Sequence, residues 1–401
     1  MILLLIISPG LYTCIDPYNP NLQSYESLLV VDALVTDEFV SNTVRLSRTF
    51  QNQSEEPEMV SGAEVHIIDD AGNIAEFFEA SPGIYLSPDF IGEIGTTYVL
   101  HIITPDGHEY ESDPSHMSQV PEIDSIYFAY DTDFNNTGNV ELEGIRLFVD
   151  SDPDNDYCTY FRWTFEECWK FRIPNPALYV YFNENLILPA PFINSVCWHH
   201  NNSTEVLIES TETQQTEQIR RKPIFFIASG ESNRLQIQYS INVKQYSLSR
   251  ADYEFWDNMK QIREEGGDIF ERQPFSVIGN VHCISDPNQK VLGYFQVSAV
   301  KQKRQYITRE ELKNIDIPSY HYPCSRVVIG PDDFEDPESP FPVPLPTFDE
   351  LYEMYTSKGF VFIEPVYDNT LEKLVFTEPI CSDCALAGGD VIKPDWWIDL
   401  D

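Results

Sequence analysis

A mainly β fold is predicted by three features of this sequence. Short runs rich in β-branched and aromatic residues recur along the chain, and Gly, Pro, Asn and Asp separate them as turn formers. The 42% hydrophobic and 13% aromatic content is typical of a folded chain rather than a disordered one. The 401 residues suit two domains that each bury a core. We therefore predict an N-terminal immunoglobulin-like or transthyretin-like β-sandwich, followed by a larger β-rich α+β domain.

The first segment resembles the signal of a lipoprotein. Its apolar run from Ile2 to Ile7 is too short to span a bilayer and fits the hydrophobic region of a signal peptide. The residues that follow, ending in Cys14, resemble a lipobox, in which the Cys thiol carries diacylglycerol. We expect residues 1–14 to be the signal and lipobox, and the polar residues 15–27 to be a tether. A buried N-terminal strand with an incidental cysteine is the alternative interpretation.

The charge balance narrows the class of partner. With 25 basic and 65 acidic residues the formal net charge is −40, which disfavours nucleic acid or an anionic membrane surface. Cationic ligands and divalent ions stay open, although solubility of an exposed protein is the favoured explanation. No other stretch approaches the roughly 18 apolar residues of a membrane helix, so the expected membrane attachment is the lipid.

Residues 28–118 are predicted to form the β-sandwich domain. Within it, Tyr98, Leu100 and Ile102 alternate with smaller or more polar neighbours, as in a half-buried strand. About seven short strands in about 90 residues are typical of such a sandwich. The expected strands lie at 28–36, 43–50, 63–70, 74–78, 83–87, 97–103 and 108–112.

Residues 119–401 are predicted to form the second, β-rich domain, with one helix near 250–266. Ser249 and Asp252 stand at capping-box spacing before that helix, and Gly266 and Gly267 end it. The acidic, proline-rich segment 331–348 is expected to be a surface loop or linker. The expected strands lie at 123–130, 144–151, 157–165, 222–229, 234–248, 275–284, 290–307 and 359–366.

The chain has eight cysteines, and assigning Cys14 to the lipid leaves seven. In an oxidising compartment at most three disulfides form among them, and the sequence leaves the pairing open. Cys381 and Cys384 make a lone CxxC without a second CxxC or a nearby His pair. A structural disulfide, local or to Cys324, is therefore favoured over metal or redox chemistry. The disulfide candidates are Cys168, Cys197, Cys283, Cys324, Cys381 and Cys384.

One acidic loop is a candidate calcium site, formed by Asp150, Asp152, Asp154 and Asp156. Carboxylates at this spacing are able to surround Ca²⁺, but Pro153 lies among them and the glycine and distal Glu of an EF-hand loop are missing. A solvated acidic turn is the favoured interpretation, and no other cofactor is predicted. The adjacent residues His199 and His200 would point to opposite faces of a strand and so would not share a metal.

No catalytic residue is predicted. The patterns GxSxG, HExxH and GxGxxG and the P-loop are absent from the sequence, so an enzyme is unsupported. The tryptophans either form an exposed binding surface or fill the core, and core filling is favoured because large aromatics mostly bury. They are Trp163, Trp169, Trp198, Trp256, Trp396 and Trp397.

Several stretches together resemble one family. They are 28–36 with 43–50, 62–67 with 83–87, 239–256, 278–284 with 291–304, and the ending 381–397. The chain resembles the Bacteroidota lipoproteins catalogued as domain of unknown function 4249, most specifically at Tyr239 to Trp256 and Gly279 to Arg304. Gly279 and Gly293 within these stretches are expected to allow turns or close strand approach.

This resemblance implies a lipid-anchored outer-membrane protein that faces the cell surface or the periplasm. Such proteins are often encoded beside a TonB-dependent receptor, so the expected function is a binding accessory of nutrient uptake with that receptor as partner. The alternatives are a structural or adhesive envelope protein, or an enzyme acting on exported polymers. No activity or site residue comes with the resemblance.

Overall fold

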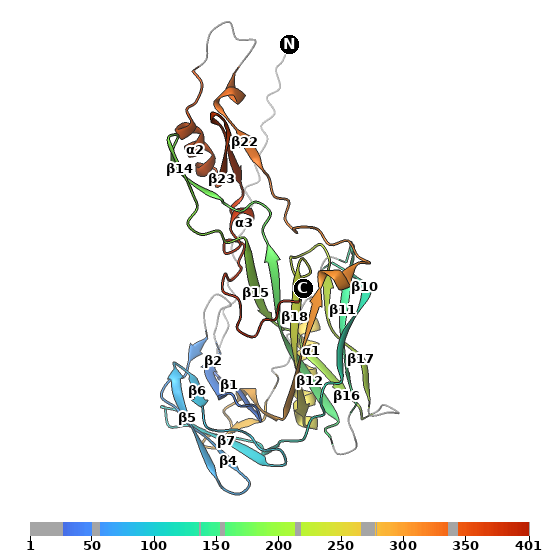
Figure 1. The fold of residues 1–401 in the computed structure, drawn as a ribbon. Coiled ribbons are helices and arrows are strands. Elements are labelled where there is room, and N and C mark those ends of the chain that lie inside the picture. The colour runs from blue at the N-terminus through green and yellow to red at the C-terminus, as the bar shows by residue number, and fades with distance from the viewer. Residues whose placement is uncertain are drawn as a thin grey trace, which may run out of the picture.

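The computed structural model describes residues 27–49, 57–135, 138–152, 157–212, 218–265, 277, 279–335 and 344–400. Figure 1 shows a body of β-sheets and a smaller lobe that projects from it. Strands outnumber helices throughout the described residues, so the prediction of a mainly β fold is confirmed.

Seven N-terminal strands follow the predicted positions and form one continuous hydrogen-bonded path, and two short strands, β3 and β9, pair beside it. They are β1 (Leu29–Thr36), β2 (Asn42–Arg48), β3 (Glu58–Met59), β4 (Glu64–Asp69), β5 (Ile74–Ser81), β6 (Ile84–Ser87), β7 (Thr97–Ile103), β8 (Glu109–Ser112) and β9 (Ser115–His116). Burial alternates along β7 as the sequence predicts, with Tyr98, Leu100 and Ile102 buried. Strand β5 pairs with both β4 and β6 and so joins the two halves of the path.

Two strands from much later in the chain complete this path. They are β19 (Val281–Cys283), which pairs with β8, and β20 (Val291–Ser298), which runs parallel to β1. The predicted boundary at residue 118 places both strands in the second domain. Their pairing partners, β8 and β1, belong to the first domain. The local pattern could not indicate this, because the partners are far apart in sequence.

Glycine makes the parallel contact with β1 feasible. Gly293 lies opposite Val31 with φ of +90°, and a Cβ built on it would lie 1.8 Å from the carbonyl oxygen of Val31. A Cβ on Gly279 would in turn lie 1.6 Å from the carbonyl oxygen of Gly293. The close strand approach expected at these two glycines is therefore present.

Two further sheets complete the body. One contains β10 (Ser125–Phe134), β11 (Glu141–Ser151) and β17 (Ile219–Ala228), and the other contains β12 (Tyr160–Arg172), β15 (Val196–Asn202), β16 (Leu207–Ser210), β18 (Gln238–Leu248) and β21 (Val300–Thr308). A single buried cluster includes Leu46 and Tyr110 of the N-terminal strands together with Trp163 and Ile241 of the second sheet. The two predicted units thus share one core.

Helix α1 (Arg250–Glu265) lies where the sequence predicts it. The backbone N–H of Ser249 donates to the Asp252 carboxylate at 2.7 Å, and the N–H of Asp252 donates to Ser249 Oγ at 3.1 Å, so the predicted capping box is present. The helix contacts β12, β16 and β18, so it packs on the sheet that contains these strands. Gly266 and Gly267 lie outside the described residues.

The projecting lobe consists of residues 178–190, 327–335 and 344–377. It contains β13 (Tyr179–Asn183), β14 (Leu186–Pro189), β22 (Val327–Ile329), the 3₁₀ helix η2 (Pro331–Phe334), α2 (Phe348–Ser357), β23 (Val361–Asp368) and β24 (Thr370–Thr377). Its own core consists of Tyr181, Leu351, Phe362, Leu374 and Phe376. Two short helices lie outside it, η1 (Arg309–Leu312) in the body and α3 (Pro379–Ser382) at the base of the lobe.

Helix α2 corrects the prediction of one helix in the second domain. It begins at Phe348, the last residue of the proline-rich segment, and the prolines before it favour a loop rather than a helix at this point of the sequence. Thr347 Oγ1 accepts from the Glu350 N–H at 3.2 Å and the Glu350 carboxylate accepts from the Thr347 N–H at 2.8 Å, so a capping box starts the helix. Of the loop predicted at 331–348, residues 336–343 lie outside the described residues.

Candidate functional site

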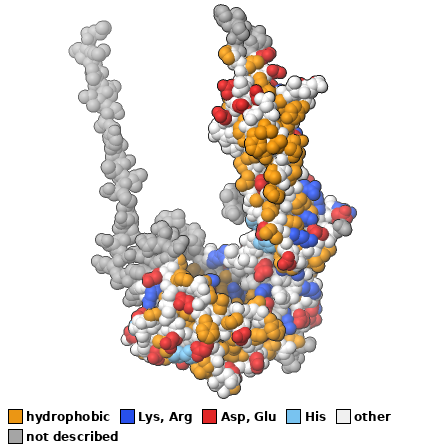
Figure 2. All heavy atoms as spheres, turned by 60° about the vertical axis from the view of Figure 1, so that its left-hand side comes forward, with side chains coloured by type: hydrophobic (Ala, Val, Ile, Leu, Met, Phe, Trp, Pro, Cys, Tyr) orange, Lys and Arg blue, Asp and Glu red, His pale blue; other side chains and the backbone are white. Residues whose placement is uncertain are grey.

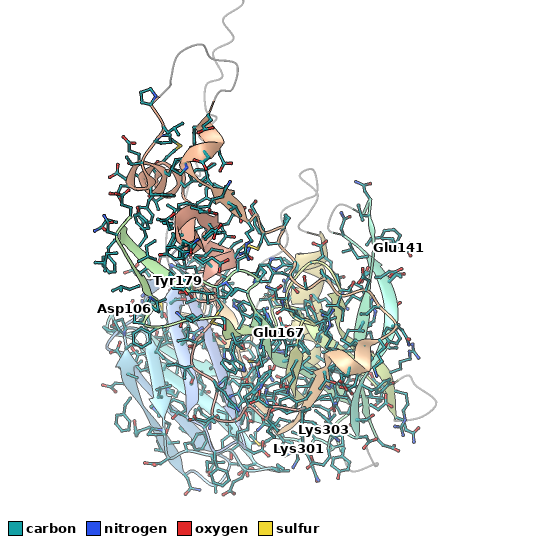
Figure 3. The ribbon with its side chains drawn as sticks, turned by 45° about the horizontal axis from the view of Figure 1, so that its top comes forward. Asp106, Glu141, Glu167, Tyr179, Lys301 and Lys303 are labelled. Carbon is teal, nitrogen blue, oxygen red and sulfur yellow. A yellow bond between two sulfur atoms is a disulfide. The ribbon has the colours of Figure 1, made fainter. Side chains whose placement is uncertain are left out.

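The two strands β13 and β14 form a hairpin with two unlike faces. In their register Val180 lies opposite Leu188, and Tyr181 lies opposite Ile187. Because side chains alternate along a strand, these two pairs point to opposite sides of the hairpin. Figure 3 shows Tyr179 near the foot of the lobe, where the hairpin starts. The inner face carries Tyr179, Tyr181 and Ile187, which pack on the core of the lobe.

Tyr181 links the hairpin to α2 through a ring contact and a hydrogen bond. Its ring stacks on Tyr352 with centroids 4.5 Å apart, and its hydroxyl donates to the Asp349 carboxylate at 2.5 Å. The backbone N–H of Glu184, at the hairpin turn, donates to the same carboxylate oxygen at 3.1 Å. Burial, together with the neighbouring Asp349 carboxylate, raises the pKa of Tyr181 well above its usual range. The inner face is therefore fixed in place.

The outer face of the hairpin is apolar and has no partner among the described residues. We call it the apolar face, and it comprises Leu178, Val180, Phe182, Leu186 and Leu188, all of which are exposed. Phe182 is 60% exposed, and Phe192, which follows the hairpin in the sequence, is 84% exposed. Figure 2 shows apolar side chains gathered along the projecting lobe. Contiguous exposed apolar surface of this kind marks an interaction site in soluble proteins.

The surroundings of the apolar face are acidic. The described residues of the lobe include ten Asp and Glu side chains but two lysines, Lys358 and Lys373. Lys373 pairs with Asp333 at 2.9 Å, which further reduces the free positive charge. The lobe that carries the apolar face is thus strongly acidic.

Two disulfides hold the base of the lobe. Cys381 pairs with Cys324, and Cys384 pairs with Cys197 of β15. The CxxC is thus divided between two disulfides, one of which is the Cys324 pairing that the sequence left open. Because Cys197 belongs to the body, the second disulfide ties the segment that follows the lobe to the sheet of β12, β15, β16, β18 and β21.

The remaining described cysteines are free thiols, and all three are buried: Cys158, Cys168 and Cys283. Burial raises the pKa of Cys158 and of Cys168 to about 12, so neither thiol is reactive at neutral pH. Cys168 and Cys283 were disulfide candidates, and in the structure neither has a partner cysteine. Cys14 lies outside the described residues.

The candidate calcium loop is described at two of its four carboxylates. Asp152 pairs with Arg220 at 3.0 Å, and Asp150 accepts hydrogen bonds from the Tyr127 hydroxyl at 3.1 Å and from the Arg221 N–H at 2.7 Å. Asp154 and Asp156 lie outside the described residues. Within the described ranges no group of three or more His, Cys, Asp or Glu side chains is arranged to hold a metal.

The histidine and tryptophan candidates mostly have structural contacts. Nδ1 of His199 lies 2.7 Å from the Gly388 carbonyl oxygen, and the ring of His200 contacts the ring of Trp396. Of the six tryptophans, Trp396 is exposed and Trp256 is partly buried. The Arg304 guanidinium lies 3.7 Å from the centre of the Trp396 ring. The other four fill the core: Trp163, Trp169, Trp198 and Trp397.

The apolar face itself was not predicted from the sequence. Residues 178–193 show apolar side chains at both alternating sets of positions, so periodicity does not separate an inner from an outer face. The signal that was available is the turn around Asn183 and Asn185 between two apolar runs, which favours a hairpin.

Comparisons with known proteins give one match. A family model described as Domain of unknown function (DUF4249) matches residues 15–304, a range that includes β13, β14 and the apolar face. No curated protein and no solved structure matches the chain. Across the described part of the chain, no helix has both the length and the apolar character needed to cross a membrane.

Proposed function

This chain belongs to the DUF4249 family, and from that premise we propose that it is a lipid-anchored binding accessory of an outer-membrane uptake complex. Its lipid anchor is Cys14, and its partner is a β-barrel receptor of the TonB-dependent class. The observation that carries the proposal is the exposed apolar face of the β13–β14 hairpin.

The chemistry of the lobe favours a protein over a lipid surface as the partner. An apolar face alone would suit either, but the acidic lobe repels the anionic headgroups of a membrane. A protein interface needs an apolar centre with large side chains and a polar rim that excludes water. Phe182 supplies a large exposed side chain, and the acidic side chains of the lobe supply polar groups.

The two disulfides support a location of the protein outside the cytoplasm. Paired cysteines persist in oxidising compartments, which include the bacterial periplasm and the cell surface. Two disulfides at the base of the lobe also limit its motion relative to the body. A docking surface held in a fixed orientation loses less conformational entropy on binding than a mobile one.

Affinity purification from native outer membranes tests the proposal. Tagged wild-type protein is compared with Cys14→Ala, Phe182→Ser and the control Phe78→Ser, and co-purifying proteins are identified by mass spectrometry. Phe78 lies on β5 in the body and is 67% exposed, so its substitution removes a similar exposed ring away from the lobe.

We expect a TonB-dependent barrel to co-purify with the wild type and with Phe78→Ser. Cys14→Ala should lose it because the anchor is missing, and Phe182→Ser should recover several-fold less. Equal recovery with Phe182→Ser would show that the apolar face is not the contact. Recovery of no barrel with the wild type would contradict the proposed partner.

A further inference from the structure

A second surface lies on the body, along the edge of strand β17. This strand is the outer member of the sheet β10-β11-β17. Strand β16 of the neighbouring sheet approaches its first half, where Lys222 Nζ donates to the Ile208 carbonyl oxygen at 2.7 Å and pairs with Glu209 at 3.1 Å. Beyond Lys222 no strand among the described residues pairs with this side of β17. Its second half is therefore a free edge.

The register determines which backbone groups face this edge. Ser229 N–H donates to the Glu143 carbonyl oxygen at 2.9 Å, and Ala228 lies opposite Gly144 with Phe226 opposite Arg146. Backbone groups alternate between the two sides of an antiparallel strand. The N–H and C=O groups of Phe226 and Ala228 therefore point away from β11, toward the free edge. Such unpaired groups are a template for another strand.

A groove of about 800 Å³ lies beside this half of β17 and extends over β10 and β11, where Asp133, Phe134, Leu142 and Arg146 line it. Residues 223–228 of β17 form one wall, and Glu205, Leu207, Glu231 and Arg234 are among those on the others. Figure 3 shows Glu141 at the outer end of the same sheet and Glu167 in the interior of the body. This volume is in the range of sites that enclose a ligand rather than a bound water.

Charge in the groove is not balanced. Arg146 is held by Asp131 at 2.6 Å and Asp133 at 2.8 Å, and Arg234 is held by the buried carboxylate of Glu167 at 2.7 Å. Both guanidinium groups are thus already neutralised. Glu205 interacts electrostatically with Arg263, and Glu231 with His321, but neither carboxylate forms a hydrogen bond or salt bridge with any residue that the structure describes. The groove therefore complements a positive charge beside an extended backbone.

We propose that the edge of β17 binds an extended polypeptide segment of a partner protein as an added strand. Backbone hydrogen bonds to Phe226 and Ala228 hold the segment, and a lysine or arginine of the segment faces Glu205 and Glu231. Strand addition of this kind derives affinity from the main chain and specificity from the side-chain positions. The surface is separate from the apolar face, so it does not depend on the function proposed for the lobe.

The test uses two synthetic peptides of eight residues, in which valine and threonine alternate around a central lysine or a central glutamate. Binding is measured by fluorescence anisotropy, and hydrogen exchange of the full chain is followed with and without peptide. We expect the lysine peptide to bind at least tenfold more tightly than the glutamate peptide. It should slow exchange of the Phe226 and Ala228 amides, because these gain partners.

Ala228→Pro removes one of the two amides, and Ala228→Ser is its matched control. Proline is tolerated at an edge position whose N–H lies outside the ladder. We expect Ala228→Pro to weaken binding at least tenfold, while Ala228→Ser and Phe78→Ser bind as the wild type does. The double variant Glu205→Gln with Glu231→Gln keeps the backbone and should remove the preference for lysine. Absence of binding by both peptides, or unchanged binding by Ala228→Pro, would overturn the proposal.

Discussion

Val180 and Leu188 lie directly opposite each other across the β13–β14 ladder, and both side chains are exposed. The other face of the same hairpin is already packed on the lobe through Tyr181. A polar pair at this position would therefore leave the fold intact, and an apolar pair contributes to stability mainly if another surface covers it. Substitutions at this pair should therefore change binding without changing folding, and the two effects are measurable separately.

The double variant Val180→Thr with Leu188→Thr should fold normally and bind poorly. Threonine is β-branched, which suits a strand, so we expect the free energy of unfolding to change by about 0.5 kcal/mol or less. Recovery of the barrel partner should fall several-fold. Urea unfolding and co-purification measure the two effects. A loss of stability without a loss of binding would show that the pair serves the fold.

Tyr181→Phe should weaken the link between the hairpin and α2. The substitution keeps the stacked ring and removes the hydroxyl that donates to Asp349. Hydrogen bonds to charged groups contribute about 1.5–3 kcal/mol, so we expect a loss of stability in that range. Urea unfolding, with hydrogen exchange across residues 179–189, measures it. Unchanged exchange in the hairpin would argue against this link.

Gly293→Ala should be strongly destabilising. The added Cβ meets the Val31 carbonyl oxygen and the left-handed φ is unfavourable for alanine, which together predict about 2–5 kcal/mol. Gly72→Ala is the matched control, because Gly72 has φ of +84° and nothing within 4 Å of its built Cβ. Its cost should stay near about 1–2 kcal/mol. Equal losses for both variants, measured by thermal unfolding, would contradict the close approach of β1 and β20.

Cys381 and Cys384 belong to different disulfides, so proteolysis should give a specific set of linked peptides. A protease that cleaves before Asp383 separates Cys381 from Cys384. Without reduction, the Cys381 peptide should be recovered linked to Cys324 and the Cys384 peptide linked to Cys197. Mass spectrometry with and without a reductant identifies the pairs. A peptide pair joined through Cys381 and Cys384 themselves would contradict the structure.

Asp399 predicts a pH dependence of stability. Hydrogen bonds from Lys170 and Lys393, both at 2.7 Å, lower the pKa of its carboxyl to about 2 from a usual value of 3.8. Because the folded pKa is depressed, the contribution is fully present above about pH 4 and is lost as the pH falls toward 2. The stability difference between wild type and Asp399→Asn should shrink over this window. A difference that stays constant from pH 6 to pH 2, measured by urea unfolding, would contradict the assignment.

Local patterns in the sequence were enough to predict many of the strands. The runs at 28–36 and 63–70 correspond to β1 and β4 within one residue, and the Ser249 and Asp252 pair correctly predicts the start of α1. Each of these signals depends on neighbours along the chain. Such signals are local, so they indicate elements but not which elements pair.

The parts that could not be predicted depend on distant partners. The pairing of Val31 with Gly293 joins residues from opposite ends of the matched family region, and no local periodicity encodes it. The apolar face escaped prediction because Val180 and Tyr181 are both apolar neighbours, and only the packing of α2 shows which of them is covered. The disulfide between Cys197 and Cys384 spans 187 residues and is equally beyond spacing arguments.

Site-specific photocrosslinking in living cells tests the central claim most directly. A photoreactive phenylalanine analogue replaces Phe182 in one strain and Phe78 in another, which places the same chemistry on the apolar face and on the body. We predict a light-dependent adduct between position 182 and an outer-membrane β-barrel receptor, and none from position 78. Adducts with the same protein from both positions, or no protein adduct from position 182, would contradict docking through the apolar face.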